Sequence, residues 1–98
     1  MTEAQFSVEN EDAGPVVAVA GQLDLAVKDE LRAVLSPLTG VVTVDLTDVT
    51  FLDSSNIGVL VGVHKRLSSA GGALRLRNPQ DTPRLALETV GLQEWIDD

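Results

Sequence analysis

The alternation of apolar and polar residues near the N-terminus predicts a β-hairpin. Phe6 and Val8 alternate with polar neighbours, residues 10–14 are rich in turn formers, and an apolar run follows over 16–20. Alternation with a period of two is typical of strands, and a turn-rich segment between two such runs is typical of a hairpin. We therefore expect two paired strands at the start of the chain.

After the hairpin, the pattern changes to helical periodicity and then back to that of a strand. Apolar side chains recur at the spacing of one face of an amphipathic helix at Val27, Leu31, Val34 and Leu35. Asp24 precedes this stretch and is a possible helix cap. The β-branched run over 41–46 predicts a further strand, and its continuous apolar character predicts burial on both faces.

A helix is predicted after Asp53, ending near residues 69–72, and a strand with one wet face over 74–77. Pro83 suits the first turn of a last helix that stops at Gly91. The order of elements is strand, strand, helix, strand, helix, strand, helix. It predicts an α/β sandwich in which helices pack on a mixed sheet with an N-terminal hairpin.

Length and composition narrow the class of protein. Ninety-eight residues with 44% apolar content favour a single domain over 1–98. A net charge of −8 argues against direct binding to the phosphate backbone of nucleic acid. The chain has no cysteine, no basic, apolar leader at its start and no apolar run of membrane-spanning length, so we expect a cytoplasmic protein without membrane insertion.

The helix after Asp53 has two contrasting faces. One arc is apolar and should lie on the sheet: Ile57, Leu60, Val61, Val63, His64 and Leu67. The opposite arc, here called the glycine face, consists of Ser55, Gly58, Gly62, Arg66 and Ser69. Each glycine inside an exposed helix costs about 1 kcal/mol relative to alanine. The glycines therefore indicate either a docking surface for a partner or close packing of another helix of the same domain.

No catalytic set emerges from the remaining polar residues. Ser54 or Ser55 is able to serve simply as the helix cap. His64, the only histidine, lies among apolar residues and is expected to be packed. Asp45, Asp48 and Asp53 lack the spacing of a calcium loop, and no phosphate-binding glycine loop is present. We expect no enzyme activity, no metal and no cofactor.

The segment VDLTDVTFLDSSNIGVLVGVHKRLSSAGGALRLRN, with the earlier GQLD and the later RLALETVGL, resembles the STAS domains of bacterial anti-sigma factor antagonists. The similarity extends from about Val16 to Leu92. Its most specific part is an acidic residue and two serines at a helix start, after an apolar strand ending in D-L-x-x-V-x-F-x-D.

This resemblance implies a binding protein in a partner-switching circuit that controls a sigma factor. The unphosphorylated protein would bind an anti-sigma factor that is also a serine kinase, and would thereby release the sigma factor. The kinase would inactivate it by phosphorylating Ser55, and a phosphoserine phosphatase would restore it. The implied partner-binding residues are Asp24, Asp53, Ser54, Ser55, Asn56, Gly58, Gly62 and Arg66.

One residue departs from the family pattern, because Asn56 stands where a glycine usually follows the second serine. The helical wheel directs Asn56 away from the glycine face, so we expect partner binding to be preserved. A side chain beside the acceptor would still be able to slow phosphorylation. The alternatives are a non-phosphorylated STAS subunit that regulates a membrane transport complex, and a ligand sensor with the same fold.

Overall fold

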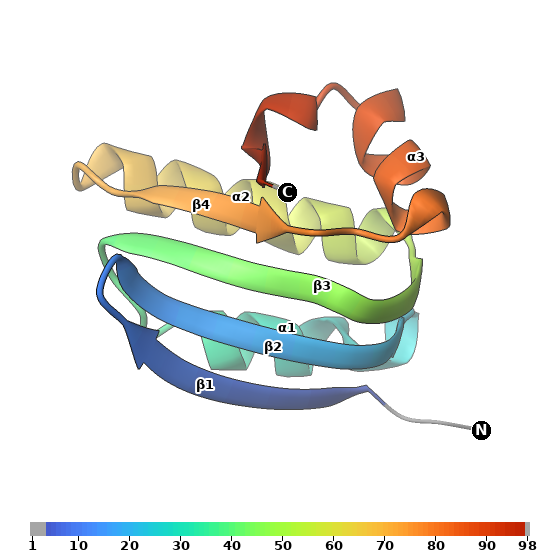
Figure 1. The fold of residues 1–98 in the computed structure, drawn as a ribbon, viewed down its shortest axis with the longest axis horizontal. Helices are drawn as coiled ribbons and strands as arrows, with labels where there is room; N and C mark the ends of the chain where they lie inside the picture. Colours follow the sequence, from blue (N-terminus) through green and yellow to red (C-terminus); the bar gives the residue numbers. More distant parts are fainter. Residues whose placement is uncertain (1–3, 98) are drawn as a thin grey trace.

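In the computed structural model, which describes residues 4–97, five strands form one mixed sheet in the order β1-β2-β3-β4-β5 (Figure 1). The strands are β1 (Gln5–Glu11), β2 (Gly14–Leu23), β3 (Val41–Leu52), β4 (Ala73–Arg77) and β5 (Ile96–Asp97). The helices are α1 (Lys28–Leu35), α2 (Ser54–Ser69) and α3 (Asp81–Thr89), with short 3-10 turns η1 (Leu25–Val27) and η2 (Gln93–Trp95). The predicted α/β architecture is confirmed.

The hairpin of β1 and β2 is the antiparallel part of the sheet, and the pairs β2–β3, β3–β4 and β4–β5 are parallel. Phe6 pairs with Val19 and Val8 with Val17, in agreement with the expected alternation. The parallel pairs β2–β3 and β3–β4 are connected through α1 and α2 respectively. Both helices lie behind the sheet in Figure 1, and α3 lies beyond one end of β4.

The core lies between the sheet and the helices α1 and α2. Fully or almost fully buried side chains come from both layers: Val17, Val42, Val44, Leu46, Leu31, Leu35, Leu60 and Leu67. Burying one such side chain contributes about 1.5–3 kcal/mol, so this layer is the main source of stability. It also fixes which face of α2 remains accessible.

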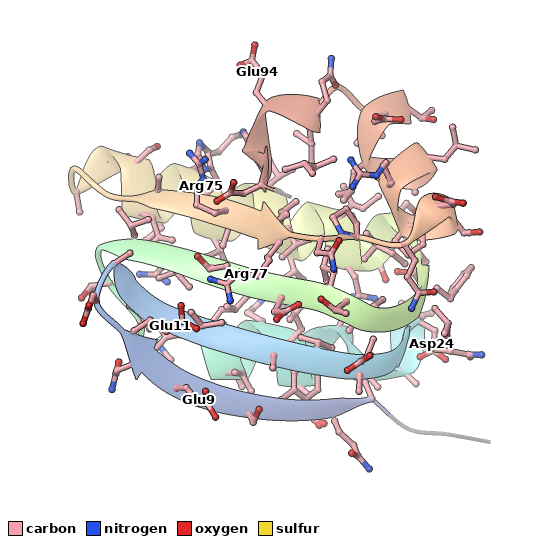
Figure 2. The ribbon with its side chains drawn as sticks, viewed as in Figure 1. Glu9, Glu11, Asp24, Arg75, Arg77 and Glu94 are labelled. Atoms are coloured by element: carbon pink, nitrogen blue, oxygen red, sulfur yellow. The ribbon has the colours of Figure 1, made fainter. Side chains whose placement is uncertain are left out.

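The opposite face of the sheet is open, so the prediction that 41–46 is buried on both faces is wrong. Val42, Val44 and Leu46 face the helices, whereas Val41 is 41% exposed on the other side. Figure 2 shows that this face carries charged side chains instead, including Glu11 and Arg77, which form an ion pair of 3.2 Å. The β-branched run reflects strand propensity rather than a second covering layer.

The start of β4 requires glycine, because the chain passes very close to the segment before β3. A Cβ atom on Gly72 would overlap the carbonyl group of Gly40. At the preceding helix end, Gly71 adopts a φ of +86°, and the N–H of Gly72 donates to the carbonyl of Leu67 over 2.8 Å. The Gly-Gly pair therefore ends α2 and admits the close approach of the two strands.

The segment after α3 was not expected to join the sheet. It forms η2 and the short β5, where Ile96 pairs with Leu76 of β4. Trp95 stacks on His64 of α2 with ring centroids 4.1 Å apart, which fastens this segment to the helical layer. No helix within residues 4–97 has the length and apolar character needed to cross a membrane.

Candidate functional site

Asp53 occupies the junction between β3 and α2 and caps the helix. Its backbone is extended, and its Oδ1 accepts a hydrogen bond of 3.0 Å from the backbone N–H of Asn56. Its own N–H donates to the carbonyl of Leu23 over 3.1 Å, which ties the junction to the end of β2. A carboxylate here satisfies a free N–H group of the first turn and lies at the positive end of the helix dipole.

Ser55 presents a hydroxyl group beside this carboxylate. Its Oγ donates to Oδ1 of Asp53 over 2.7 Å, and the side chain is half-buried, whereas Ser54 is exposed. The interpretation of either serine as the helix cap is wrong, because Asp53 fills that role. The Ser55 hydroxyl is instead positioned by the cap.

Asn56 lies beneath these residues and is fully buried. Its Nδ2 donates to Oδ1 of Asp53 and to the carbonyl of Asp24, each over 2.8 Å. Its Oδ1 is buried without a hydrogen-bond partner among the described residues. The side chain points away from the glycine face, in agreement with the helical wheel. A fully buried side chain cannot contact a partner directly, so any role of Asn56 in binding would operate through Asp24 and Asp53.

The hydrogen bonds at Asp53 also determine its protonation. Partial burial by itself raises the pKa of Asp53, because desolvation disfavours the charged form. Hydrogen bonds from the Ser55 hydroxyl and from the backbone and side chain of Asn56 outweigh this effect, so the pKa lies below its ordinary value. The site therefore contains a carboxylate, and not a carboxylic acid, throughout the physiological pH range.

Asp24 lies at the end of β2, next to the same junction. Its side chain accepts a hydrogen bond of 3.0 Å from the N–H of Ala26, so the predicted cap is confirmed, although it caps η1 and not α1 itself. Its carbonyl receives the Asn56 amide. The structure therefore brings Asp24, Asp53, Ser55 and Asn56 together in one hydrogen-bonded group.

The glycine face runs along α2 away from this group. Gly58 and Gly62 are both exposed, and a Cβ atom on either would meet no described atom within 4 Å outside its own helix. The explanation that another helix of the domain packs closely against them is therefore wrong. The buried face is shifted from the expected one, since Val59 is buried while Val61 and His64 are only half-buried.

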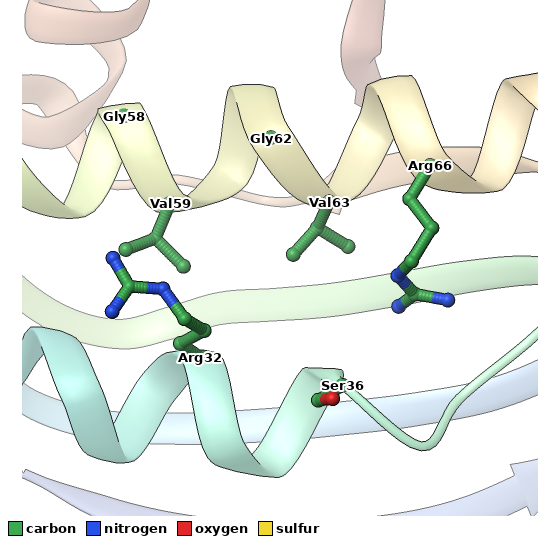
Figure 3. A pocket seen from close by; sticks show the side chains of 7 residues that line it. All are labelled: Arg32, Ser36, Gly58, Val59, Gly62, Val63 and Arg66. Carbon is green, nitrogen blue, oxygen red and sulfur yellow. The ribbon is translucent and has the colours of Figure 1, made fainter.

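A hollow of about 310 Å³ lies between the glycine face and α1 (Figure 3). It is lined by Arg32, Ser36, Gly58, Val59, Gly62, Val63 and Arg66. Arg66 donates to the carbonyls of Leu38 and Leu35 over 2.9 and 3.0 Å, at the end of α1. Two hydrogen bonds to backbone carbonyls hold the guanidinium in a fixed position. The sequence pattern predicts a role for Arg66 but not for Arg32 and Ser36, because only the fold brings α1 alongside α2.

An apolar groove of about 450 Å³ between the start of α2 and α3 was also missed. Phe51, Leu85 and Val90 line it and are 43%, 65% and 53% exposed. Ser54 lies on the same lining, so the groove adjoins the serine pair. The sequence signal for this groove is an apolar residue, such as Leu85, at a position where the helical pattern would otherwise place a polar one.

The His64 side chain has a structural role. Its Nδ1 accepts a hydrogen bond of 3.3 Å from the N–H of Leu74, and its ring stacks on Trp95. Asp45 accepts hydrogen bonds from the N–H and hydroxyl groups of Thr47. Within residues 4–97, no group of three or more His, Cys, Asp or Glu side chains is placed to hold a metal ion. The chemistry that the arrangement offers is an accessible hydroxyl at one end of a smooth surface.

Comparison with known proteins gives consistent results. Residues 6–97 match the family model described as "Mlab, STAS domain". The chain is 33% identical over 84 residues to the anti-sigma-B factor antagonist of Bacillus subtilis (strain 168), covering 83% of this chain and 77% of that protein. It is 32% identical over 88 residues to the anti-sigma F factor antagonist of Lysinibacillus sphaericus, covering 85% and 75%.

Two solved structures have the same fold and are 26% identical in sequence. The anti-sigma factor antagonist SpoIIAA in its unphosphorylated form superposes with a TM-score of 0.86, covering 96% of this chain and 87% of that chain. The Bacillus cell fate determinant SpoIIAA in the phosphorylated form gives 0.78, covering 96% and 90%. The fold is therefore shared with a protein whose structure is known in both its unphosphorylated and its phosphorylated form.

Proposed function

Because the chain belongs to the STAS domain family, and its relatives include antagonists of anti-sigma factors, we propose that it binds an anti-sigma factor with serine kinase activity and so releases a sigma factor. Phosphorylation of Ser55 switches this binding off, and a phosphoserine phosphatase restores it. The partner contacts Asp24, Asp53, Ser54 and Ser55 at one end of the surface. The glycine face continues the contact along α2.

The observation that carries this proposal is the position of the Ser55 hydroxyl. It is held by Asp53 at the first turn of α2, where the exposed glycine face begins. A modification at this point alters the surface while the apolar face of the helix remains in the core. Binding and folding are therefore separable at Ser55, as a switch requires.

The proposed transfer converts the hydroxyl into a phosphate ester. Oγ of Ser55 attacks the γ-phosphorus of a nucleoside triphosphate, the bond to the bridging oxygen breaks, and the nucleoside diphosphate leaves. The hydroxyl proton is lost to solvent, so Ser55 can no longer donate to Asp53. The phosphate brings a charge of about −1.5 to −2 next to the Asp53 carboxylate. The phosphatase reverses the change by hydrolysis, which releases inorganic phosphate.

Because the Asn56 side chain is buried, it does not obstruct access of a kinase to the Ser55 hydroxyl. A residue larger than glycine after the acceptor would obstruct a kinase if its side chain projected outward. Here the side chain is fully buried and hydrogen-bonded to Asp24 and Asp53. The surface around the acceptor is therefore not enlarged by the substitution.

The test is the affinity of Ser55 variants for the cognate anti-sigma factor, measured by isothermal titration calorimetry. We expect Ser55→Ala to bind about as well as the parent and Ser55→Asp to bind at least about tenfold more weakly, which corresponds to about 1.4 kcal/mol. Ser68→Asp is the matched control, since it adds the same charge to an exposed serine of α2 outside the glycine face, and it should leave the affinity unchanged. Equal affinities for the parent and both Ser55 variants would exclude a switch at Ser55.

Site-localised phosphopeptide mass spectrometry on protein from its native cells provides the second test. We expect phosphate on Ser55, with an occupancy that differs between growth and stress. A well-detected peptide that is never phosphorylated would favour a constitutive binding protein, such as a regulatory subunit of a transport complex. Co-purification with a transport ATPase would then identify that function.

A further inference from the structure

The hollow between α1 and α2 has an apolar floor and a positively charged rim. Val59 and Val63 form the floor together with the backbone at the two glycines, and Arg32 and Arg66 project from opposite helices (Figure 3). Among the described residues, those that line the hollow include no Asp or Glu. In a chain with a net charge of −8, a cavity whose charged lining is entirely cationic is a distinct electrostatic feature.

The two arginines differ in how they are held. Two carbonyl groups at the end of α1 fix the Arg66 guanidinium, which has more N–H donors than these two bonds use. Arg32 pairs with Asp29 over 2.9 Å, and both side chains are mostly exposed. An exposed pair of this kind contributes about 0.2–1 kcal/mol, so Arg32 can exchange Asp29 for another carboxylate at little cost.

The glycines keep the hollow open. A methyl group at Gly58 or Gly62 would project into space that no described residue outside α2 fills. The floor therefore has room for one apolar side chain from another molecule. An anchor of this kind in a preformed pocket is typical of the residues that dominate binding energy in protein interfaces.

We propose that this hollow receives an acidic, amphipathic segment of the anti-sigma factor. An apolar side chain of that segment packs on Val59 and Val63, and a neighbouring carboxylate binds Arg32 or Arg66. This inference rests on the proposed function, because the hollow extends the surface that begins at Ser55. It adds the chemistry of the partner and a contribution from α1.

The sign of the charge explains how modification of Ser55 acts on this contact. A phosphate group adds negative charge at one end of the surface that attracts the acidic segment. Repulsion between charges of the same sign lowers the association rate, and the added phosphate must also be desolvated in the interface. Phosphorylation therefore opposes the same complementarity that the two arginines provide.

Calorimetry with the purified cognate anti-sigma factor tests the inference with three variants. Arg32→Glu reverses one rim charge without removing the carbonyl contacts of Arg66, and we expect at least about tenfold weaker binding. Gly62→Leu fills the hollow and is expected to weaken binding similarly. Arg75→Glu reverses a charge on the open face of the sheet and should leave the affinity within about twofold of the parent.

A charge-swap experiment separates a direct contact from an indirect effect on folding. Replacing the acidic residues of the partner segment by lysine should weaken binding to the parent and restore binding to Arg32→Glu. Unchanged affinity of Arg32→Glu and Gly62→Leu, with normal binding by the parent, would overturn this inference and leave the proposed function intact. Absence of binding by the parent would overturn both. Occupation of the hollow by a second copy of the chain, visible as a dimer in light scattering that the same two variants abolish, would also overturn it.

Discussion

Oδ1 of Asp53 is the atom on which the candidate site depends. It accepts three hydrogen bonds, from the Ser55 hydroxyl and from the backbone and side chain of Asn56. Hydrogen bonds to a charged acceptor are stronger than those between neutral groups. The carboxylate consequently serves the fold, as the helix cap, and the proposed switch, as the partner of its hydroxyl.

The first prediction concerns the charge of this residue. Asp53→Asn keeps the shape and a capping oxygen but removes the charge, and we expect the free energy of unfolding at pH 7 to fall by about 1 kcal/mol. Because the pKa of Asp53 is lowered in the folded state, its stabilising effect is present above the ordinary pKa of aspartate. The effect is lost as the pH falls through the lowered value. The difference between parent and variant should therefore shrink below about pH 4.

Urea denaturation between pH 7 and pH 3 measures this difference. Glu94→Gln, which neutralises an exposed carboxylate in η2, serves as the control and should show a small effect at every pH. A difference for Asp53→Asn that is independent of pH would contradict the role assigned to the charge.

The second prediction concerns Asn56. Asn56→Ala leaves the Asp24 carbonyl without its amide donor and should cost about 2–3 kcal/mol of unfolding free energy. Asn56→Asp should cost more at pH 7, because it buries a second carboxylate against Asp53. Its deficit should decrease at acidic pH, where a protonated carboxyl group can again donate. An Asn56→Asp variant as stable as the parent at pH 7 would show that the hydrogen-bond assignment is incorrect.

At the scale of the element, α2 combines one face that stabilises the fold with one that does not. The buried face anchors the helix on the sheet, and the glycine face leaves the adjacent hollow open. Helix propensity alone would favour alanine at both glycine positions. The two glycines therefore lower the local stability of the helix while they leave the hollow open.

The third prediction follows from this trade-off. Gly58→Ala and Gly62→Ala should each raise the free energy of unfolding by about 0.5–1 kcal/mol, because the new methyl group meets no described atom and the helix gains propensity. The same changes should weaken binding of the anti-sigma factor. Gly72→Ala is the contrasting control and should destabilise, since its Cβ would overlap the Gly40 carbonyl. More stable variants with unchanged affinity would remove the glycine face from the interface.

Local patterns were sufficient to predict the hairpin, the three α-helices and the exposed glycine face. They were insufficient where a contact joins distant segments. Asn56 was recognised as a departure from the family pattern, but its bond to the Asp24 carbonyl spans 32 positions of sequence. The place of Arg32 beside the hollow depends in the same way on how α1 packs against α2.

The sheet shows a second limit of sequence patterns. A β-branched run is compatible with burial on one face or on two, because strand propensity and burial favour the same side chains. The charged neighbours Asp45 and Arg77 carry the relevant information, as they occupy the open face. The short β5 could not be expected either, since Ile96 and Asp97 are paired through contacts with β4.

At the scale of the whole molecule, charge is distributed unevenly. The open face of the sheet carries both signs of charge, with Glu9 and Glu11 beside Arg75 and Arg77 (Figure 2), whereas the charged side chains that line the hollow on the helical side are arginines. A net charge of −8 on 98 residues destabilises the compact state through self-repulsion. Added salt screens that repulsion.

The fourth prediction is that salt stabilises the free protein. Raising the NaCl concentration from about 0.01 M to about 1 M shortens the Debye length from about 30 Å to about 3 Å, so the thermal midpoint should rise by several degrees. Glu9→Lys lowers the magnitude of the net charge and should reduce the response. A midpoint that falls with salt would indicate that favourable ion pairs such as Arg77–Glu11 outweigh the repulsion.

The stack of Trp95 on His64 places the only indole of the chain at the seam between the last segment and the helical layer. The protein therefore contains an intrinsic fluorophore that reports on this seam, whereas circular dichroism reports mainly on the three α-helices. Melting curves from fluorescence and circular dichroism show whether the contact between the last segment and the helical layer opens before the rest of the domain unfolds or together with it. A native optical label of this kind allows the end of the chain to be followed without attaching a dye.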